Sequence, residues 1–269
     1  MGQPSWAPGD VDIEQPSVAR VYDYYLGGSH NFAADRQAAR ATIELLPDLP
    51  LIMQAGRAFL RRSVRYLVKQ GITQFLDIGS GIPTEGNVHE VAQVASPETR
   101  VLYVDTDPVA VAHSRAILAG NQRADIVQAD LRDLPRILDD PRCRRLIDVT
   151  QPIGVLMVAI LHFIPDQLEA EGIVAEYRNA MAPGSYLALT HASYGGPSEQ
   201  QAEAASEVYQ RTIAPFKRRS HAEIEALLDG FDLVPPGLVF FPLWRPDSPA
   251  DVDDHPERCR GYAAVGRRD

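Results

Sequence analysis

Apolar residues recur at helical spacing in the first quarter of the chain. Ser17 is a suitable N-cap, the apolar side chains over 18–26 fall on one helical face, and two glycines then end the pattern. The same spacing predicts helices over 33–46 and 51–70, with prolines 47 and 50 ending the first of them. Residues 1–16 contain three prolines and little periodicity, so this part is expected to be irregular.

From residue 73 the pattern changes to short apolar runs that alternate with helical segments. Strands are expected at 73–78, 100–105, 124–130, 153–161 and 185–192, and helices over 86–95, 108–119 and 166–181. Continuous apolar strands are typical of a parallel sheet that is covered on both faces. Two further strands near 233–243 and 261–266 are expected to form an antiparallel hairpin, because no helical pattern separates them.

This order predicts an α/β fold with a doubly wound, Rossmann-like and mostly parallel sheet, an antiparallel C-terminal edge hairpin and an added N-terminal helical segment. The chain divides accordingly into an irregular tail (1–16), a helical segment (17–70) and a main domain (71–269). Ligands of such sheets bind at the carboxyl ends of the strands, where the strand order reverses.

Charge and composition restrict the class of partner. The 269 residues include 26 basic and 36 acidic side chains, a formal net charge of −10, which argues against nucleic acid and favours a small molecule. Neither a membrane-spanning run nor a signal peptide is recognisable, so a cytoplasmic location is expected. Cys143 and Cys259 lack a C-x-x-C partner, and no metal-ligand spacing is evident, so neither a disulfide nor a metal is predicted.

Acidic and glycine residues gather at the ends of the first three predicted strands. In FLDIGSGIPTEG, Gly79 and Gly81 permit a tight turn and close approach to a ligand, but Thr84 occupies the place of the third glycine in the dinucleotide fingerprint. Asp105 stands where a Rossmann site holds a ribose, and Asp130 ends the third strand. The alternative role for these acids is helix capping, which Asp107 is also placed to perform.

These motifs, FLDIGSGIPT, YVDTDP, QADLRD and VLMVAILHFIPD, resemble the successive cofactor motifs of class I S-adenosylmethionine-dependent methyltransferases. The opening PSVARVYDYYLGGSHNFAADRQAA resembles that of an actinobacterial S-adenosyl methyltransferase family, and the similarity extends from about Pro16 through the final strand. A sulfonium cofactor has no pyrophosphate, so the third glycine is not required. Asp77 also suits a positively charged cofactor better than a pyrophosphate.

The resemblance implies S-adenosylmethionine as cofactor and S-adenosylhomocysteine as product, but it does not identify the acceptor. Transferred to matching positions, the residues expected around the methionine part are Asp77, Gly79, Ser80 and Gly81. Asp105, with the adjacent Thr106, would hold the ribose, and Asp130 with Leu131 the adenine.

Methyl transfer chiefly requires alignment and exclusion of water, so a general base is optional. His162, just past the fourth strand, is the candidate base or positioning group; its alternative role is packing. Candidate acceptor contacts are Tyr22, Tyr25, His30, Asn31, Phe32, His191 and Tyr194. The first two helices are interpreted as a lid over the cofactor, and the alternatives are simple docking of the helices or a dimer contact.

The leading hypothesis is therefore a methyltransferase with a small-molecule acceptor, as a monomer or homodimer. A non-catalytic protein that binds S-adenosylmethionine or S-adenosylhomocysteine is one alternative. An NAD-dependent oxidoreductase is the other, disfavoured by Pro83 and Thr84 in the first turn.

Overall fold

The computed structural model describes residues 11–83, 86–195 and 199–269. Its central feature is an eight-stranded sheet in the order β3-β2-β1-β4-β5-β8-β6, with β7 also paired to β8. The strands are β1 (Gln74–Ile78), β2 (Arg100–Asp105), β3 (Ala124–Gln128), β4 (Gly154–Val158), β5 (Tyr186–Ala192), β6 (Asp232–Leu233), β7 (Val239–Phe240) and β8 (Gly261–Arg267). Strands β1 to β5 are parallel, whereas β8 is antiparallel to β5, β6 and β7. The sheet is thus mostly parallel with an antiparallel edge, as predicted, and its order reverses between β1 and β4.

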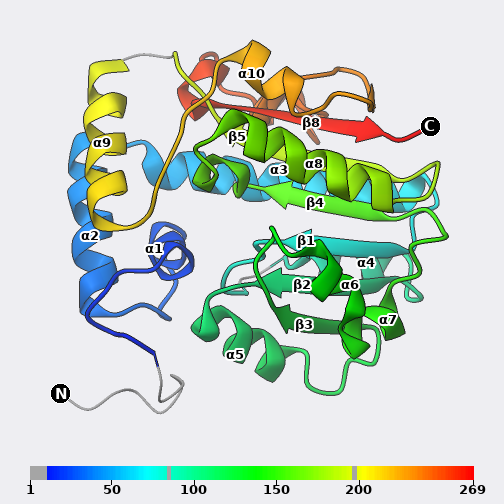
Figure 1. Ribbon diagram of the computed structural model, residues 1–269. Coiled ribbons are helices and arrows are strands. Elements are labelled where there is room, and N and C mark those ends of the chain that lie inside the picture. Colours follow the sequence, from blue (N-terminus) through cyan, green and yellow to red (C-terminus); the bar gives the residue numbers. More distant parts are fainter. Residues whose placement is uncertain (1–10, 84–85, 196–198) are drawn as a thin grey trace.

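Helices lie on both faces of this sheet and beyond one of its edges (Figure 1). The longer ones are α1 (Val18–Tyr25), α2 (Ala33–Leu45), α3 (Leu49–Lys69), α4 (Val88–Ala95), α5 (Pro108–Ile117), α8 (Gln167–Ala180) and α9 (Glu199–Thr212). The shorter ones are α6 (Leu134–Asp139), α7 (Pro141–Leu146), α10 (His221–Ala226) and the 3-10 turns η1 (Leu161–Phe163), η2 (Phe241–Leu243), η3 (Pro249–Asp251) and η4 (Pro256–Cys259).

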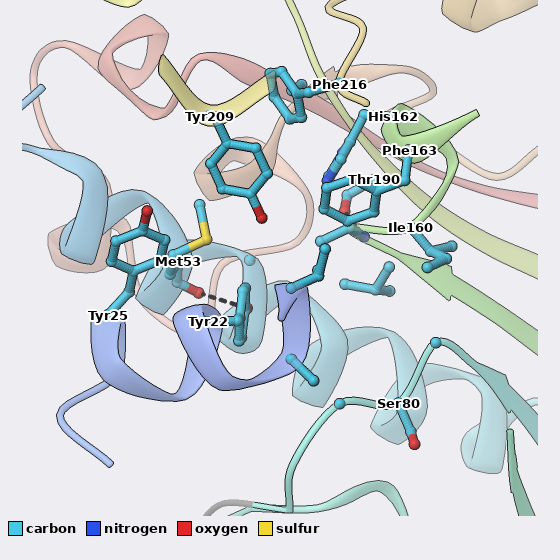
Figure 2. A pocket seen from close by; sticks show the side chains of 18 of the residues that line it. Tyr22, Tyr25, Met53, Ser80, Ile160, His162, Phe163, Thr190, Tyr209 and Phe216 are labelled. Carbon is cyan, nitrogen blue, oxygen red and sulfur yellow. Dashed lines mark hydrogen bonds between the residues drawn. The ribbon is translucent and has the colours of Figure 1, made fainter. Parts of the chain in front are cut away.

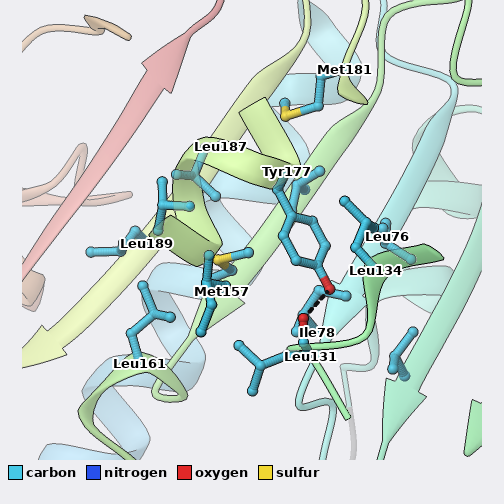
Figure 3. Close-up of a cluster of buried hydrophobic side chains, with 14 of the residues drawn as sticks. Leu76, Ile78, Leu131, Leu134, Met157, Leu161, Tyr177, Met181, Leu187 and Leu189 are labelled. Carbon is cyan, nitrogen blue, oxygen red and sulfur yellow. Dashed lines mark hydrogen bonds between the residues drawn. The ribbon is translucent and has the colours of Figure 1, made fainter. Parts of the chain in front are cut away.

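Alternating strand residues supply two apolar cores, one on each face. Leu76 and Ile78 of β1 pack with α6, α7, α8 and α10, and Tyr177 of α8 donates a hydrogen bond of 3.0 Å to the carbonyl of Leu131 there (Figure 3). Phe75 of β1 packs on the other face with α3, α4 and Trp244. Burial on both faces explains the continuous apolar runs of the central strands.

A third packing unit lies at the carboxyl ends of the parallel strands. Helices α1, α2 and α9 stand beside these ends in Figure 1, and α2 packs along α9. Val21, Tyr25, Ala38 and Ala39 form a small apolar cluster there, with Tyr209 of α9 against it. This cluster is separate from the two cores of the sheet, so the N-terminal helices pack over the ligand-binding edge as a distinct unit.

Three details of the predicted elements are wrong. The expected strand over 233–243 is interrupted after Leu233 and resumes only at β7, because two prolines and Gly237 lie between and proline offers no N–H to a neighbouring strand. Pro50 lies in the first turn of α3 instead of ending α2, a position where proline is compatible with a helix. The prediction also omitted helices, namely α9 and the short α6, α7 and α10. Thr84 and residues 1–10 lie outside the described residues, so what was expected of them stays a prediction.

Candidate active site

The loop after β1 forms one wall of a cavity at the carboxyl ends of the strands. Gly79 and Gly81 have φ values of +70° and +68°, which favour glycine, and the Gly79 amide donates to the carbonyl of Val104 at 2.8 Å. A Cβ at Gly79 would lie 2.5 Å from Cδ1 of Ile160, in the loop after β4. The turn therefore brings backbone close to the β4 loop, as expected for a ligand-binding loop at this position.

Ser80 lies between these glycines and also lines the cavity. Its Oγ is buried and has no hydrogen-bond partner among the described residues. A buried hydroxyl without a partner costs free energy. The Oγ has no exposed surface in the cavity and points away from the chamber in Figure 2, so a rotation of the side chain would be needed for a polar ligand atom to provide that partner.

Two buried carboxylates stand on neighbouring strands beside this loop. Asp105 accepts hydrogen bonds from the amides of Gly81 (2.7 Å) and Asp107 (2.8 Å). Burial raises the pKa of Asp105 to about 6, although these amides oppose the shift. Burial raises the pKa of Asp77 further, to about 7, with Arg57 opposing and the charge of Asp105 adding to the rise. Each acid would be stabilised as a carboxylate by a cation placed in the cavity.

The remaining cofactor candidates border the same cavity. Asp107 caps α5 by accepting from the amides of Val109 and Ala110, the role considered for it from the sequence. Thr106 follows Asp105 at the cavity wall, and Leu131 is buried there. Asp130 also lines the cavity, but it lies two residues beyond β3 and forms an ion pair with Arg132 (3.1 Å).

The cavity continues past the loops into an apolar chamber under the N-terminal helices. Its total volume is about 400 Å³. Tyr22 and Tyr25 of α1 point into it opposite Phe163, Tyr209 and Phe216 (Figure 2). Other apolar lining residues are Leu46, Leu49, Ile52, Met53, Leu60, Val158 and Ile160. The Tyr25 hydroxyl is paired with Thr42 (2.6 Å), and the Tyr22 hydroxyl donates to the carbonyl of Met53 (3.4 Å).

His162 of η1 lies at the junction of the chamber and the β4 loop. Its ring is buried, and its Nδ1 has no hydrogen-bond partner among the described residues. Burial, with the nearby His191 and Arg219, holds the pKa of His162 well below its ordinary value. The imidazole is therefore neutral near pH 7, and it is a weak proton acceptor that can still form a hydrogen bond.

The other candidate acceptor residues do not line this cavity. His30 contacts the ring of His113 at a centroid distance of 3.9 Å, and Asn31 donates to Asp23 (2.8 Å), which holds the turn between α1 and α2. Phe32 packs in a small cluster with Ile82. His191 lies within β5, not after it; its neighbours Thr190 and Ala192 face the cavity, because strand side chains alternate. Tyr194 is exposed and stacks with Arg218.

Sequence reasoning missed the contribution of α9 and the segment after it. Tyr209 and Phe216 form a large part of the aromatic wall. The stretch EQQAEAASEVYQRT is rich in strong helix formers, and this signal would have revealed the helix. That α9 packs against α2 could not be inferred from the sequence pattern alone. Among the residues that the structure describes, no cluster of His, Cys, Asp and Glu could hold a metal ion.

Comparison with known proteins identifies the family. A model of the S-adenosyl methyltransferase family matches residues 4–269. This chain belongs to that family. Two solved structures are similar over nearly their whole length: a protein from Thermobifida fusca designated a candidate methyltransferase (39% identity, TM-score 0.92, covering 98% of this chain and 99% of that one), and a DUF574 family protein from Streptomyces avermitilis (39%, 0.90, 96% and 99%).

A more distant match extends the fold relationship. Human N-acetylserotonin methyltransferase, solved in complex with S-adenosylmethionine, is 14% identical, with a TM-score of 0.51 over 95% of this chain and 63% of that one. A search of curated proteins finds no match. The chain is thus an S-adenosylmethionine-dependent methyltransferase of an actinobacterial family, and its cofactor is S-adenosylmethionine, as the resemblance implied.

The cavity has the groups that this cofactor requires. One space is bordered by Ser80, whose buried hydroxyl has no partner among the described residues, by the close backbone approach at Gly79, and by the two acids whose pKa values burial raises. A cationic ligand with a nucleoside and an amino acid part matches these groups in charge and in polarity.

Proposed function

We propose that this methyltransferase acts on a small, largely apolar molecule that binds in the chamber beneath α1, α2 and α9. The observation that carries the proposal is the continuity of one cavity, which has polar groups and acids at the strand ends and aromatic side chains under the helices. The polar end is suited to the cofactor. The aromatic end leaves room for an apolar acceptor in line with it.

Specific roles follow for the residues at the polar end. Asp77, Gly79, Ser80 and Gly81 would surround the methionine part of the cofactor. Asp105 and Thr106 would hold the ribose, and Asp130 with Leu131 the adenine. The bound cofactor would supply an activated methyl group; the chain holds the acceptor and excludes water.

Helices α1 and α2 of the segment 17–70 would cover the reaction as a lid, whereas α3 packs against the sheet of the domain 71–269. Ser17, at the start of α1, donates a hydrogen bond to Asp107 beside the cofactor loop, and both residues line the cavity. Arg20 and the buried Asp35 form an ion pair (3.3 Å) that joins α1 to α2. The lid is therefore attached at the edge of the cofactor site, where cofactor binding would affect its position.

The enclosed cavity and the net charge of −10 support a small molecule over a nucleic acid as partner. No helix among the described residues is long and apolar enough to cross a membrane. A cytoplasmic location, and a monomeric or homodimeric state, stay predictions from the sequence.

Ser80→Ala provides the test of the cofactor site. The substitution removes a buried hydroxyl without a partner, so the free protein should gain stability while its affinity for S-adenosylhomocysteine falls about three- to tenfold, the effect of losing one hydrogen bond. Thermal unfolding and calorimetric titration measure the two effects.

Ser193→Ala is the matched control. Its Oγ is also buried without a partner among the described residues, but Ser193 does not line the cavity. It should gain stability and keep wild-type affinity. If Ser80→Ala binds S-adenosylhomocysteine as the wild type does, the proposed position of the cofactor is wrong.

A further inference from the structure

The distribution of charge around the cavity restricts the acceptor more narrowly than its apolar lining does. Among the described lining residues, the acids are Asp77, Asp105, Asp107 and Asp130, and all four lie in or just after β1, β2 or β3. None lies on α1, α2, α3 or α9, or in the loops after β4 and β5. An ammonium group in the chamber would therefore have no carboxylate partner on the acceptor side.

Four arginines among the described residues line the cavity (Arg57, Arg132, Arg218 and Arg260), and a further cation is buried behind the acceptor side. Arg219 is fully buried, and its guanidinium donates to neutral groups: the Gln167 side chain, the carbonyls of Leu161 (3.1 Å) and Ile164 (2.8 Å), and Nε2 of His191 (2.7 Å). The acids that attract it through space are Glu223, Asp166 and Glu171, and none of them lines the cavity. Its positive charge therefore acts on the chamber without a carboxylate between.

Arg219 also positions the groups that face the acceptor. The two carbonyls that it binds, of Leu161 and Ile164, flank His162 and Phe163. His191 contacts Ala192 O through Nδ1 (2.7 Å) and accepts from Arg219 through Nε2, so its neutral form is fixed as the Nδ1–H tautomer. The His191 ring lies 5.7 Å from that of His162, edge to face.

Besides the acids, the polar side chains that line the cavity include Thr42, Thr190, Ser206 and the arginines Arg57, Arg132, Arg218 and Arg260. Tyr209 and His162 are two neutral hydrogen-bonding groups among the aromatic side chains of the chamber. The Tyr209 hydroxyl points into the cavity from α9, and no hydrogen bond to it is formed by the described residues (Figure 2). His162 is neutral, and it lies near Tyr209, because both rings contact Phe216. Both can donate a hydrogen bond to an oxygen, and neither carries a negative charge to hold a cation.

We propose that the acceptor is an aromatic molecule methylated on a hydroxyl oxygen, which binds as the oxyanion with Tyr209 and His162 as hydrogen-bond donors and with Arg219 and the lining arginines as the sources of the positive field. The inference rests on the proposed function of this cavity. The hydroxyl proton leaves to solvent when the acceptor binds. An oxygen lone pair then forms the bond to the methyl carbon as the carbon–sulfur bond breaks and its electron pair stays on sulfur, so no base is needed in the closed site.

The test uses three probes of one shape: 4-nitrophenol, 4-nitrobenzylamine and 4-nitrotoluene. Each is titrated into the full-length protein saturated with S-adenosylhomocysteine, and absorbance reports the ionised fraction of the bound phenol. The phenol should bind at least about tenfold more tightly than the ammonium, the order expected for one charge acting at an effective dielectric constant of about 20. Bound phenol should also be more ionised than free phenol at the same pH.

Tyr209→Phe separates the hydrogen bond from the apolar contact. The variant should lose about three- to tenfold in affinity for 4-nitrophenol and keep its affinity for 4-nitrotoluene. Thr212→Val, on the same helix but outside the cavity, is the matched control and should change neither.

Equal or tighter binding of the ammonium, a bound phenol no more ionised than the free one, or binding of no probe would each overturn the inference. An equal loss of affinity for 4-nitrophenol and 4-nitrotoluene in Tyr209→Phe would overturn the role of Tyr209. Failure of the proposed function is distinguishable, because 4-nitrotoluene would then also fail to bind, whereas it would still bind if only the preference for an oxyanion were wrong.

Discussion

Protonation of the two buried acids should couple cofactor binding to pH. Asp77 and Asp105 have pKa values raised to about 7 and about 6, so the free protein holds protons on them that an unfolded chain releases at lower pH. The stability of the free protein should therefore fall as pH rises from about 4 to about 7. The affinity for a cationic ligand should instead rise with pH, because the cation binds best when both Asp77 and Asp105 are ionised.

The size of the effect follows from the two pKa values. If only the ionised forms bind the cation, raising the pH from 6.0 to 7.5 increases affinity about eightfold through Asp77 and about twofold through Asp105. The product is about fifteenfold, or about 1.6 kcal/mol. Binding in the lower part of this range should release protons.

Calorimetric titration with S-adenosylmethionine in buffers of different ionisation enthalpy measures both the affinity and the protons released. In Asp77→Asn the pH dependence should shrink to about twofold. Asp139→Asn, which alters an exposed acid paired with Arg144, should behave as the wild type. An affinity that is independent of pH in the wild type, with no proton release, would refute the assignment of these acids to the cofactor.

Three further substitutions test the cavity and the lid. Gly79→Ala should cost about 1 to 3 kcal/mol of stability and abolish S-adenosylhomocysteine binding, because φ is +70° and the new Cβ meets the β4 loop; near-wild-type melting and affinity would contradict this. Gly56→Leu, where a Cβ has open space toward the cavity, should fold normally and lose binding of 4-nitrotoluene, whereas Gly172→Leu on α8 should retain it; retention by both variants would exclude Gly56 from the acceptor wall. Ser17→Ala removes the hydrogen bond to Asp107, so hydrogen exchange of α1 should rise about two- to tenfold, and unchanged exchange would argue against this attachment of the lid.

The local spacing of apolar residues was sufficient to predict the helices that bury one face and the strands that are buried on both faces. The strands β1 to β5 were recognised because both of their faces are covered, which leaves a continuous apolar run. Helix α1 was recognised because Ser17 caps it and one face is apolar. The short α6, α7 and α10 were not, since six residues contain too little of a helical period to be distinguished from a loop.

The candidate site divides in the same way. The residues at the strand ends could be predicted because chain order and right-handed crossovers bring the carboxyl ends of parallel strands together. The acceptor side could not, because Tyr209 and Tyr22 are far apart in the chain and meet only through the packing of α9 against the N-terminal helices. His30 and Asn31 were expected at the acceptor, but in the structure their contacts are with His113 and Asp23.

The sequence by itself determined the α/β fold, the glycine turn after β1 and the acids near the carboxyl ends of the first two strands, because these depend on residue type, spacing and chain order. Only the tertiary structure decided which side chains line the chamber and that the positive charge of Arg219 lies behind it. Burial removes water from Asp77, Asp105 and His162 and changes their protonation, and Arg219 exerts its field on residues more than fifty positions earlier in the chain. The changed protonation and the field of Arg219 both depend on distances in space and on the dielectric environment, and neither can be read from the order of residues along the chain.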